Sequence, residues 1–589
     1  MKYKRHVCLL LVILQIIFLS SCTLENNLDN IGDSEIGVEE NIDNGPENGG
    51  ELIVPISYRI VLNPLLKNDK YMYNFNKLIF EGLFDIDSNF QVNNVLAESY
   101  SFESGGLVLN IKLKENVKWH DGEYFTSEDV KFTIDTIKYG MSNQSLVGSL
   151  ADFIVSSEAL KYLKEARIID EYNITLTFDR VYGDVLEGLV FPIIPKHIFQ
   201  RGKNIKIAYS NALVDENYKP IGTGPYKEFQ TNKLKNVTLE IFQDYWGNKP
   251  YISKVIGKAL KDEELAVTSF ETGQTDLATS IGIDWEKYAQ NKKVEIYEYP
   301  SNRYEFLGFN FRDGIFTGEK GKALRKAIAY AIDRQSIIQK VYLGHATRND
   351  VPIHPESWLL SDESNSYGYN VNKARQIIES AGWKDIDGDG FFEDADGNKL
   401  TIKLTTNSFN ELRRETANII AENLTDLGIN VVKDYSESKQ ENLTEEDRAA
   451  QWEALMQKLY TGSFEMVLLG WELSYIPDLS FAFHSSQIDG GMNFIGYNNV
   501  KMDELLLRIQ STFRPEDKKR LYEQVQDLII DDLPYVSLYF INSSILANSK
   551  VYGEVAPTEF NMYNKISEWY IPKALQQENV MKQEGSLKE

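Results

Sequence analysis

The chain has 589 residues, of which 42% are hydrophobic and 12% aromatic, and its formal net charge is -25. This length allows about two or three domains with a large hydrophobic core. The excess of acidic residues argues against nucleic acid or an anionic membrane surface as the main partner.

The first residues have the layout of a secretory signal. Basic residues at the start precede an apolar run over 7–19, and two serines at 20–21 lead into Cys22. The run is shorter than the ~20 apolar residues that a membrane-spanning helix needs. We therefore predict a signal peptide over 1–21. Residues 19–22 resemble the bacterial lipobox, which predicts that Cys22 is the mature N-terminus and carries a lipid such as palmitate. An ordinary secretory cleavage site with a chance cysteine is the alternative.

The residues after Cys22 predict a tether. Acidic residues, Asn and Gly dominate over 23–50, and neither Lys nor Arg occurs there. Such a segment cannot bury enough apolar surface to offset the entropy of ordering it. We expect a lipidated cysteine and a disordered acidic tether over 22–50, with a body from residue 51 held outside the cell membrane of a bacterium. The only other cysteine is Cys8, so the mature body is expected to contain no disulfide.

The body alternates between strand and helix patterns. Apolar residues at every second position predict strands over 107–113 and 237–241. Apolar stripes at helical spacing predict helices over 321–342 and 413–427, each followed closely by a glycine suited to end a helix. Pro515 is expected to open another helix. Mixed elements without regular βαβ punctuation predict an α/β protein with several lobes.

One loop has the spacing of a calcium-binding loop. Asp385, Asp387 and Asp389 stand at its first, third and fifth positions, Gly390 at the sixth and Asp396 at the twelfth. Carboxylates at this spacing can converge on one hard cation. Asp-Gly repeats also build hairpin turns through local hydrogen bonds. A weak structural calcium site and a plain turn therefore both remain open.

Motifs of the common enzyme classes do not occur. The sequence has no Gly-x-Ser-x-Gly elbow, no phosphate-binding Gly-Lys-Ser loop and no His-Glu-x-x-His helix. Its six histidines show no metal-ligand spacing to one another or to a cysteine. We expect no enzymatic activity and no cofactor beyond the candidate calcium ion.

An ordered series of motifs between about residues 75 and 545 resembles the peptide/nickel/oligopeptide group of extracellular solute-binding proteins. The motifs are IFEGL at 79–83, LAESY at 96–100, IKLKENVKWHDG at 111–122, TSEDV at 126–130, GTGPY at 222–226, LRKAIAYAIDR at 324–334, ARQIIESAGW at 374–383, GW at 470–471 and DLPY at 532–535. One such motif alone is weak, whereas the ordered series is specific.

The resemblance implies a three-lobed fold of the periplasmic-binding-protein type, with two ligand-binding lobes and one extra lobe. Lobe I would combine 51–75, 205–310 and 535–589, and lobe III would be 311–534. The extra lobe II, 76–204, would pack on lobe I. The two ligand-binding lobes would trap the ligand by hinge closure, and the closed monomer would dock on the permease subunits of an ABC transporter.

The segment that follows the predicted buried strand 466–469 is the first candidate for the ligand cleft. Strand ends that face a crevice are where open α/β folds bind ligands. The resemblance implies that backbone groups beside Trp471 pair with a peptide backbone, as in strand addition. A core role for Trp471 is the alternative. The candidates in this segment are Gly470, Trp471, Glu472, Ser474, Tyr475 and Asp478.

Many relatives carry an Asp three or five residues after this Trp, where it binds the N-terminal amine of the peptide. Here these positions are Ser474 and Ile476. A free amine is therefore expected to matter less than in those relatives, unless Glu472 or Asp478 substitutes.

Two further groups are candidates for contact with the ligand. Asn302 and Tyr304 lie where the resemblance places the crossing between the lobes. His484, Asn493 and Tyr497 form a polar group downstream of Trp471.

Three function classes follow from these observations. Capture of extended peptides for an ABC importer is the main prediction. The same fold binding another solute, such as an oligosaccharide or a metal chelate, or acting as a receptor for a signalling peptide, is the alternative. An exported hydrolase is the most distant one.

Overall fold

The computed structural model describes residues 45–576 except 201, 203, 215–217, 233–234, 282–285, 290, 365, 438–439 and 441–442. The predicted signal peptide, Cys22 and the predicted tether up to residue 44 lie outside the described residues. At the other end of the tether, the amide N of Gly49 donates to the carbonyl O of Tyr251 at 2.9 Å. The folded body therefore begins at least two residues earlier than predicted.

The first sheet has four strands in the order β1-β10-β9-β8, and β1 runs parallel to β10. Its strands are β1 (Glu51–Ser57), β8 (Tyr226–Asn232), β9 (Asn236–Ile241) and β10 (Lys254–Leu260). Two helices accompany it, α2 (Lys70–Lys77) and α8 (Glu263–Glu271). The predicted strand 237–241 is β9, with Val237 and Leu239 fully buried.

The second sheet is antiparallel, in the order β4-β5-β7-β6, and the short hairpin β2-β3 precedes it in the chain. The strands are β2 (Phe84–Ile86), β3 (Val92–Asn94), β4 (Ala97–Glu103), β5 (Val108–Leu113), β6 (Leu163–Asp170) and β7 (Asn173–Phe178). The helices of this part are α3 (Ser127–Met141), α4 (Asp152–Val155), α5 (Glu158–Tyr162), α6 (Lys196–Gln200) and α7 (Ile205–Val214). The predicted strand 107–113 corresponds to β5.

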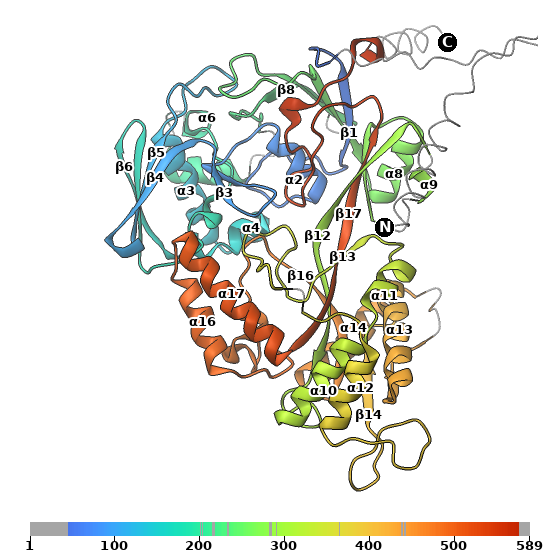
Figure 1. Ribbon diagram of the computed structural model, residues 1–589. Helices are drawn as coiled ribbons and strands as arrows, with labels where there is room; N and C mark the ends of the chain where they lie inside the picture. Colours follow the sequence, from blue (N-terminus) through green and yellow to red (C-terminus); the bar gives the residue numbers. More distant parts are fainter. Residues whose placement is uncertain are drawn as a thin grey trace, which may run out of the picture. The chain divides into compact units, whose positions relative to one another are not determined.

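The third sheet has the order β11-β17-β12-β16-β14-β15, and β13 pairs with β17. Its strands are β11 (Leu277–Ile281), β12 (Val294–Phe309), β13 (Ala346–Arg348), β14 (Thr401–Thr405), β15 (Asn430–Asp434), β16 (Met466–Glu472) and β17 (Tyr535–Asn548). Figure 1 shows the two long strands β12 and β17 running side by side as an antiparallel pair.

Most helices after residue 310 belong to the part of the chain around this third sheet. They are α10 (Gly318–Ala331), α11 (Arg334–Val341), α12 (Val371–Ser380), α13 (Glu411–Leu427), α14 (Glu445–Tyr460), α15 (Ser480–Phe483), α16 (Val500–Gln510) and α17 (Pro515–Asp532), and α9 (Glu286–Ala289) precedes them. None of the helices in the described residues is both long and apolar enough to cross a bilayer.

The predicted helix 321–342 is in fact two helices, α10 and α11. Ile332 has an extended backbone, and the side chain of Asp333 accepts a hydrogen bond from the amide of Ser336 at 3.0 Å. Asp at this position starts a new helix because it satisfies an amide that has no partner within the helix. The apolar stripe continues through the break, so periodicity alone did not show it.

The other two helix predictions are confirmed. Helix α13 ends at Gly428, whose φ of 111° is the left-handed conformation that glycine adopts without strain. Helix α17 starts at Pro515, and its buried face includes Leu521 and Val525.

The buried apolar side chains divide at β12. One cluster takes its members from 52–299 and 545–571, and two others take theirs from 304–540. The pairing of β12 with β17 shifts register between Pro300 and Tyr304, at the same place. This division lies where the crossing between lobes was expected, while the individual lobe boundaries stay a prediction.

Candidate functional site

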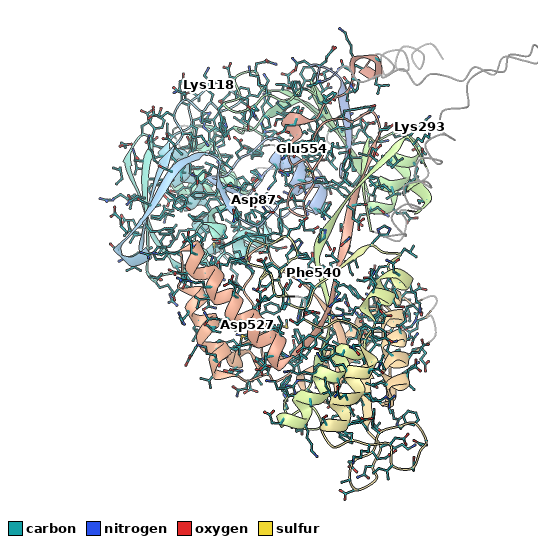
Figure 2. The ribbon with its side chains drawn as sticks, in the orientation of Figure 1. Asp87, Lys118, Lys293, Asp527, Phe540 and Glu554 are labelled. Atoms are coloured by element: carbon teal, nitrogen blue, oxygen red, sulfur yellow. The ribbon has the colours of Figure 1, made fainter. Side chains whose placement is uncertain are left out.

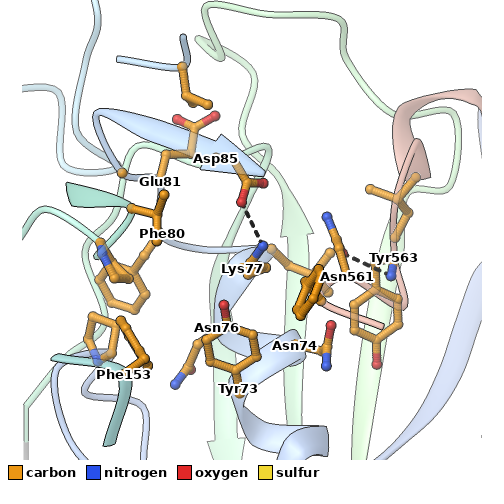
Figure 3. Close-up of a pocket in the computed structure, with 18 of the residues that line it drawn as sticks. Tyr73, Asn74, Asn76, Lys77, Phe80, Glu81, Asp85, Phe153, Asn561 and Tyr563 are labelled. Carbon is orange, nitrogen blue, oxygen red and sulfur yellow. Dashed lines mark hydrogen bonds and ion pairs between the residues drawn. The ribbon is translucent and has the colours of Figure 1, made fainter. Parts of the chain in front are cut away.

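A cavity of about 830 Å³ lies beside α2 (Figure 3). This volume falls within the roughly 300–1,000 Å³ that is typical of small-ligand sites. The lining comes mainly from segments 64–85, 151–153, 245–248 and 559–567, together with Asn302, Glu472 and Tyr475. Segments far apart in the sequence therefore build one site.

Helix α2 divides its side chains between the cavity and the core. Lys70, Tyr73, Asn74 and Lys77 line the cavity from one face of the helix, and Asn76 also belongs to the lining. Positions three or four residues apart share one face of a helix, so these four lie together. Met72 and Phe75 on the opposite face are fully buried in the core. Asp69 starts the helix by accepting the amide of Met72 at 2.9 Å.

Each lysine that lines the cavity has an acidic partner. The pairs are Lys70 with Glu559 at 3.2 Å, Lys77 with Asp85 at 2.9 Å, and Lys565 with Glu554. Burial alone would lower the pKa of Lys77, but the nearby Asp85 carboxylate outweighs it and raises the pKa. Figure 3 shows the Lys77–Asp85 contact among the residues that line the cavity.

Glu81 is held by three donors. Thr223 donates to its carboxylate at 2.8 Å, and Tyr245 and Trp246 each donate at 2.9 Å. Burial nevertheless raises the pKa of Glu81 to about 7, although these hydrogen bonds act in the opposite direction. This carboxyl group ties the wall of the cavity to the loop that carries Trp246.

Glu472 differs from the other carboxylates of the lining. Asp69 caps α2, and Asp152 pairs with Lys67 at 2.9 Å. The remaining acidic residues of the lining are bound as described above. Glu472 is exposed, and no hydrogen bond or ion pair joins its side chain to any residue that the structure describes.

Asn302 and Tyr475 lie in the same lining as Glu472. Asn302 is 7% exposed, and its side-chain oxygen has no hydrogen-bond partner within the described part of the chain. The ring of Tyr475 meets that of Phe560 edge to face at 5.7 Å. Asn302, Glu472 and Tyr475 are thus the sequence-predicted residues that the structure brings together at the cavity.

The structure places Trp471 mainly in the core. Its indole packs against the rings of Phe306, Phe481 and Phe494, with centroids 5.8, 5.2 and 5.7 Å away. Trp471 does not belong to the residues that line the cavity. The core role, which the sequence left open, describes this position.

Gly470 makes room for a buried ion pair. Arg413 binds both carboxylate oxygens of Glu305, at 2.6 and 2.9 Å. A Cβ on Gly470 would lie 2.4 Å from Oε1 of Glu305 and 2.8 Å from Nη2 of Arg413. Glycine is required here by packing inside the sheet and not by contact with the cavity.

Tyr304 was expected to face the ligand, but it is fully buried. Its hydroxyl lies 2.5 Å from Oγ of Ser537, and its ring packs on Phe540, which Figure 2 labels on β17. Side chains alternate across a strand, so Tyr304 shares a face with Phe306, and the centroids of the two stacked rings are 5.6 Å apart.

The remaining predicted residues support loops outside the cavity. Ser474 and Asp478 are exposed, and their side chains accept the amides of Ile476 and Ser480 at 3.2 and 2.8 Å.

The downstream polar group is also structural. Asn493 is fully buried and bonds the carbonyl oxygens of His484 and Tyr497, and Tyr497 donates to Asp532 at 2.7 Å. None of the three belongs to the lining of the cavity.

Sequence reasoning missed α2 and segment 559–567 as parts of the site. The available signal was the spacing of Lys70, Tyr73, Asn74 and Lys77, which places these four side chains on one face of a helix. Tyr226, the last residue of the GTGPY motif, is fully buried and donates to the carbonyl of Ile252 at 2.9 Å.

The candidate calcium loop forms a separate cluster. Carboxylate oxygens of Asp385, Asp387, Asp389 and Glu393 all lie within 4.8 Å of one another. Glu393 stands in this cluster in place of the predicted Asp396, whose amide instead donates to Asp394 in the next turn. Glu393 forms an antiparallel bridge with Lys384 across the Asp-Gly turn, and this pairing brings the ninth position of the loop beside the first.

Comparisons with known proteins cover most of the chain. The model of the family described as bacterial extracellular solute-binding proteins, family 5 Middle, matches residues 91–492. The oligopeptide-binding protein AppA of Bacillus subtilis is 28% identical over 580 residues, covering 97% of this chain and 100% of AppA. The glutathione-binding protein GsiB of Pectobacterium atrosepticum is 26% identical over 496 residues, covering 83% and 88% of the two chains.

A solved structure of AppA from Bacillus subtilis in complex with a nonapeptide has a TM-score of 0.56 and 28% identity to this chain. It covers 90% of this chain and 100% of its own. The family match spans more than half of the chain and includes most of the motifs that carried the resemblance. This chain therefore belongs to the bacterial extracellular solute-binding proteins of family 5.

Proposed function

We propose that this chain is the substrate-binding subunit of an ABC importer and that it captures peptides in the cavity beside α2. The similarity to AppA, solved with a nonapeptide, supports a peptide as the ligand. The observation that carries the proposal is the charge pattern of the lining. Glu472 is unpaired among the described residues, whereas each lining lysine has an acidic partner.

This pattern fits the N-terminus of a peptide better than its C-terminus. A free ammonium group would find the carboxylate of Glu472 available. A terminal carboxylate would have to displace an existing ion pair, such as that of Lys70 with Glu559. Glu472 thereby takes the place of the acidic anchor that the sequence lacks at Ser474 and Ile476.

Asn302 supplies a second contact. Its buried side-chain oxygen accepts no hydrogen bond from the described residues, and such a group is costly to leave unsatisfied. An amide N–H of the peptide backbone is a suitable donor. Because all peptides share this group, the contact allows loose demands on side chains.

The volume of the cavity limits the length of peptide that it can enclose. About 830 Å³ accommodates a short peptide or the first residues of a longer one. Longer peptides would extend from the opening. Aromatic side chains of Tyr73, Trp246 and Tyr475 offer apolar contact surface along the wall.

Calorimetric titration of three matched peptides tests the proposal: one with both termini free, one N-acetylated and one C-amidated. Acetylation is expected to weaken binding roughly ten- to a hundredfold, since one charge-assisted hydrogen bond is worth about 1.5–3 kcal/mol. Amidation is expected to change it less than about threefold, which corresponds to less than about 0.7 kcal/mol.

Glu472→Gln should reproduce the loss for the free peptide and remove the effect of acetylation, while Asp478→Asn serves as the matched control. If acetylation has no effect, Glu472 is not the anchor. If no peptide binds, mass spectrometry of the solute that purifies with the protein identifies another ligand class, such as an oligosaccharide or a metal chelate.

The proposal also covers the release of the peptide and the attachment of the protein to the membrane. The family consists of binding proteins, and we expect the peptide to be released intact to the permease. Peptide recovered in cleaved form would contradict this. The lipid on Cys22 would hold the monomer at the outer surface of the membrane, close to its permease.

A further inference from the structure

Figure 1 shows the long loop between α12 and β14. This loop gathers four carboxylates at one point. Asp385, Asp387 and Asp389 are exposed, whereas Glu393 is buried. Four negative charges within 4.8 Å repel one another strongly unless a cation lies between them. Lys399, which pairs with Asp389, is the only cation that an ion pair joins to these carboxylates in the described part of the chain.

Hydrogen bonds within the loop do not decide between a turn and a metal site. Asp385 accepts the amides of Gly388 at 2.8 Å and Gly390 at 3.2 Å. Asp387 and Asp389 accept amides two residues further on, at 3.1 and 3.0 Å. Both a plain Asp-Gly turn and a calcium loop use such bonds.

Glu393 supplies the independent observation. It is 3% exposed, and its Oε2 accepts the amide of Ile386 at 2.7 Å. Its Oε1 has no hydrogen-bond partner among the described residues. A buried carboxylate oxygen without a partner is costly, and a plain turn offers no reason to place a glutamate there.

The position of Glu393 is held by the backbone. Its amide N and carbonyl O both bond to Lys384, at 2.7 and 3.0 Å. The preceding residue, Phe392, is 1% exposed, and its amide donates to the carbonyl O of Gly428 at 2.8 Å. The carboxylate is therefore fixed between the Asp-Gly turn and the end of α13.

We propose that Asp385, Asp387, Asp389 and Glu393 bind one calcium ion. All four ligands are carboxylates, which are the hard oxygen donors that Ca²⁺ prefers. Softer metals favour sulfur or nitrogen ligands. The ion would satisfy Oε1 of Glu393 and relieve the repulsion among the three aspartates. Through Phe392 it would fasten the loop to the core around α13.

The experiment uses the intact protein. After removal of metal with EDTA, calorimetric titration with CaCl₂ alone should show one site with a dissociation constant on the order of 10⁻⁴–10⁻³ M, the range of extracellular calcium modules. The melting temperature should rise with CaCl₂ and rise less with MgCl₂ at the same concentration.

Glu393→Gln keeps the shape of the side chain and should weaken calcium binding at least tenfold. Asp396→Asn is the matched control and should bind like the unchanged protein, because Asp396 lies outside the cluster. The Glu393→Gln variant should melt in EDTA at or above the temperature of the unchanged protein, which shows that it folds.

Absence of any calcium response in the unchanged protein would overturn the proposal. Equal calcium binding by Glu393→Gln, or loss of binding in Asp396→Asn, would overturn it as well. Peptide binding is measured separately in EDTA. Since none of the four carboxylates lines the cavity, the fate of the calcium proposal is independent of the proposed function.

Discussion

Lys518 on α17 is the position whose removal should destabilise the protein most clearly. Its side chain is 5% exposed, and its Nζ donates to Asp184 at 2.5 Å, to Glu187 at 3.2 Å and to the carbonyl of Gly183 at 3.1 Å. Burial alone would lower the pKa of Lys518, but the two carboxylates outweigh it and raise the pKa. One buried ammonium group thus joins residues 334 positions apart in the sequence.

Lys518→Met keeps most of the apolar stem and removes the charge. Asp184 and Glu187 would then be buried with no counter-charge, and breaking such a pair costs about 3–5 kcal/mol. We expect the free energy of unfolding to fall by that amount. Adding Asp184→Asn and Glu187→Gln to the same chain should restore most of the loss, because well-packed neutral groups replace buried ion pairs at little cost.

Urea unfolding followed by circular dichroism measures this. Lys501→Met is the control, because Lys501 is exposed on α16 and should change stability by less than about 0.5 kcal/mol. A loss below about 1 kcal/mol in Lys518→Met, or a triple variant less stable than the single one, would refute the argument that the uncompensated carboxylates cause the loss.

Two further predictions concern the anchor and the wall of the cavity. Cys22→Ala should move the protein from the membrane fraction to the medium, and full retention in the membrane would contradict lipidation at Cys22. Because burial raises the pKa of Glu81 from 4.5 to about 7, its contribution to stability is complete below pH 4.5 and is lost as the pH rises to 7. As the pH rises through this window, the free energy of unfolding of Glu81→Gln should increase by up to about 3 kcal/mol relative to that of the unchanged protein. Urea unfolding at pH 4.5 and 8 measures this difference. If the free energies of unfolding of the two proteins change with pH in parallel, the argument that burial raises the pKa of Glu81 is wrong.

Local patterns predicted the elements well where one residue determines the backbone. Gly428 ends α13 and Pro515 starts α17, since glycine adopts positive φ and proline fits the first helical turn. The break between α10 and α11 escaped prediction because Asp333 interrupts the hydrogen bonds without interrupting the apolar stripe.

The block around Trp119 maintains the fold. Trp119 is fully buried, and a Cβ on Gly222 would lie 1.8 Å from the carbonyl O of Ile79. His120 accepts the amide of Gly222 at Nδ1, and burial lowers its pKa to about 4, so the ring stays neutral between these loops. Such roles follow from residue size and polarity, which the sequence shows directly.

The cavity could not be predicted in the same way. The sequence by itself determined the family, the mixture of strands and helices, and the Trp471 segment as a neighbour of the site. Only the tertiary structure decided that Glu472 faces the cavity while Trp471 and Tyr304 face the core, because a strand sends alternate side chains to opposite faces. It also decided that α2 and segment 559–567 meet there, and that Glu393, not Asp396, joins the aspartate cluster. Contacts between segments hundreds of residues apart depend on how the sheets pack, and no local pattern in the sequence encodes which of these segments meet.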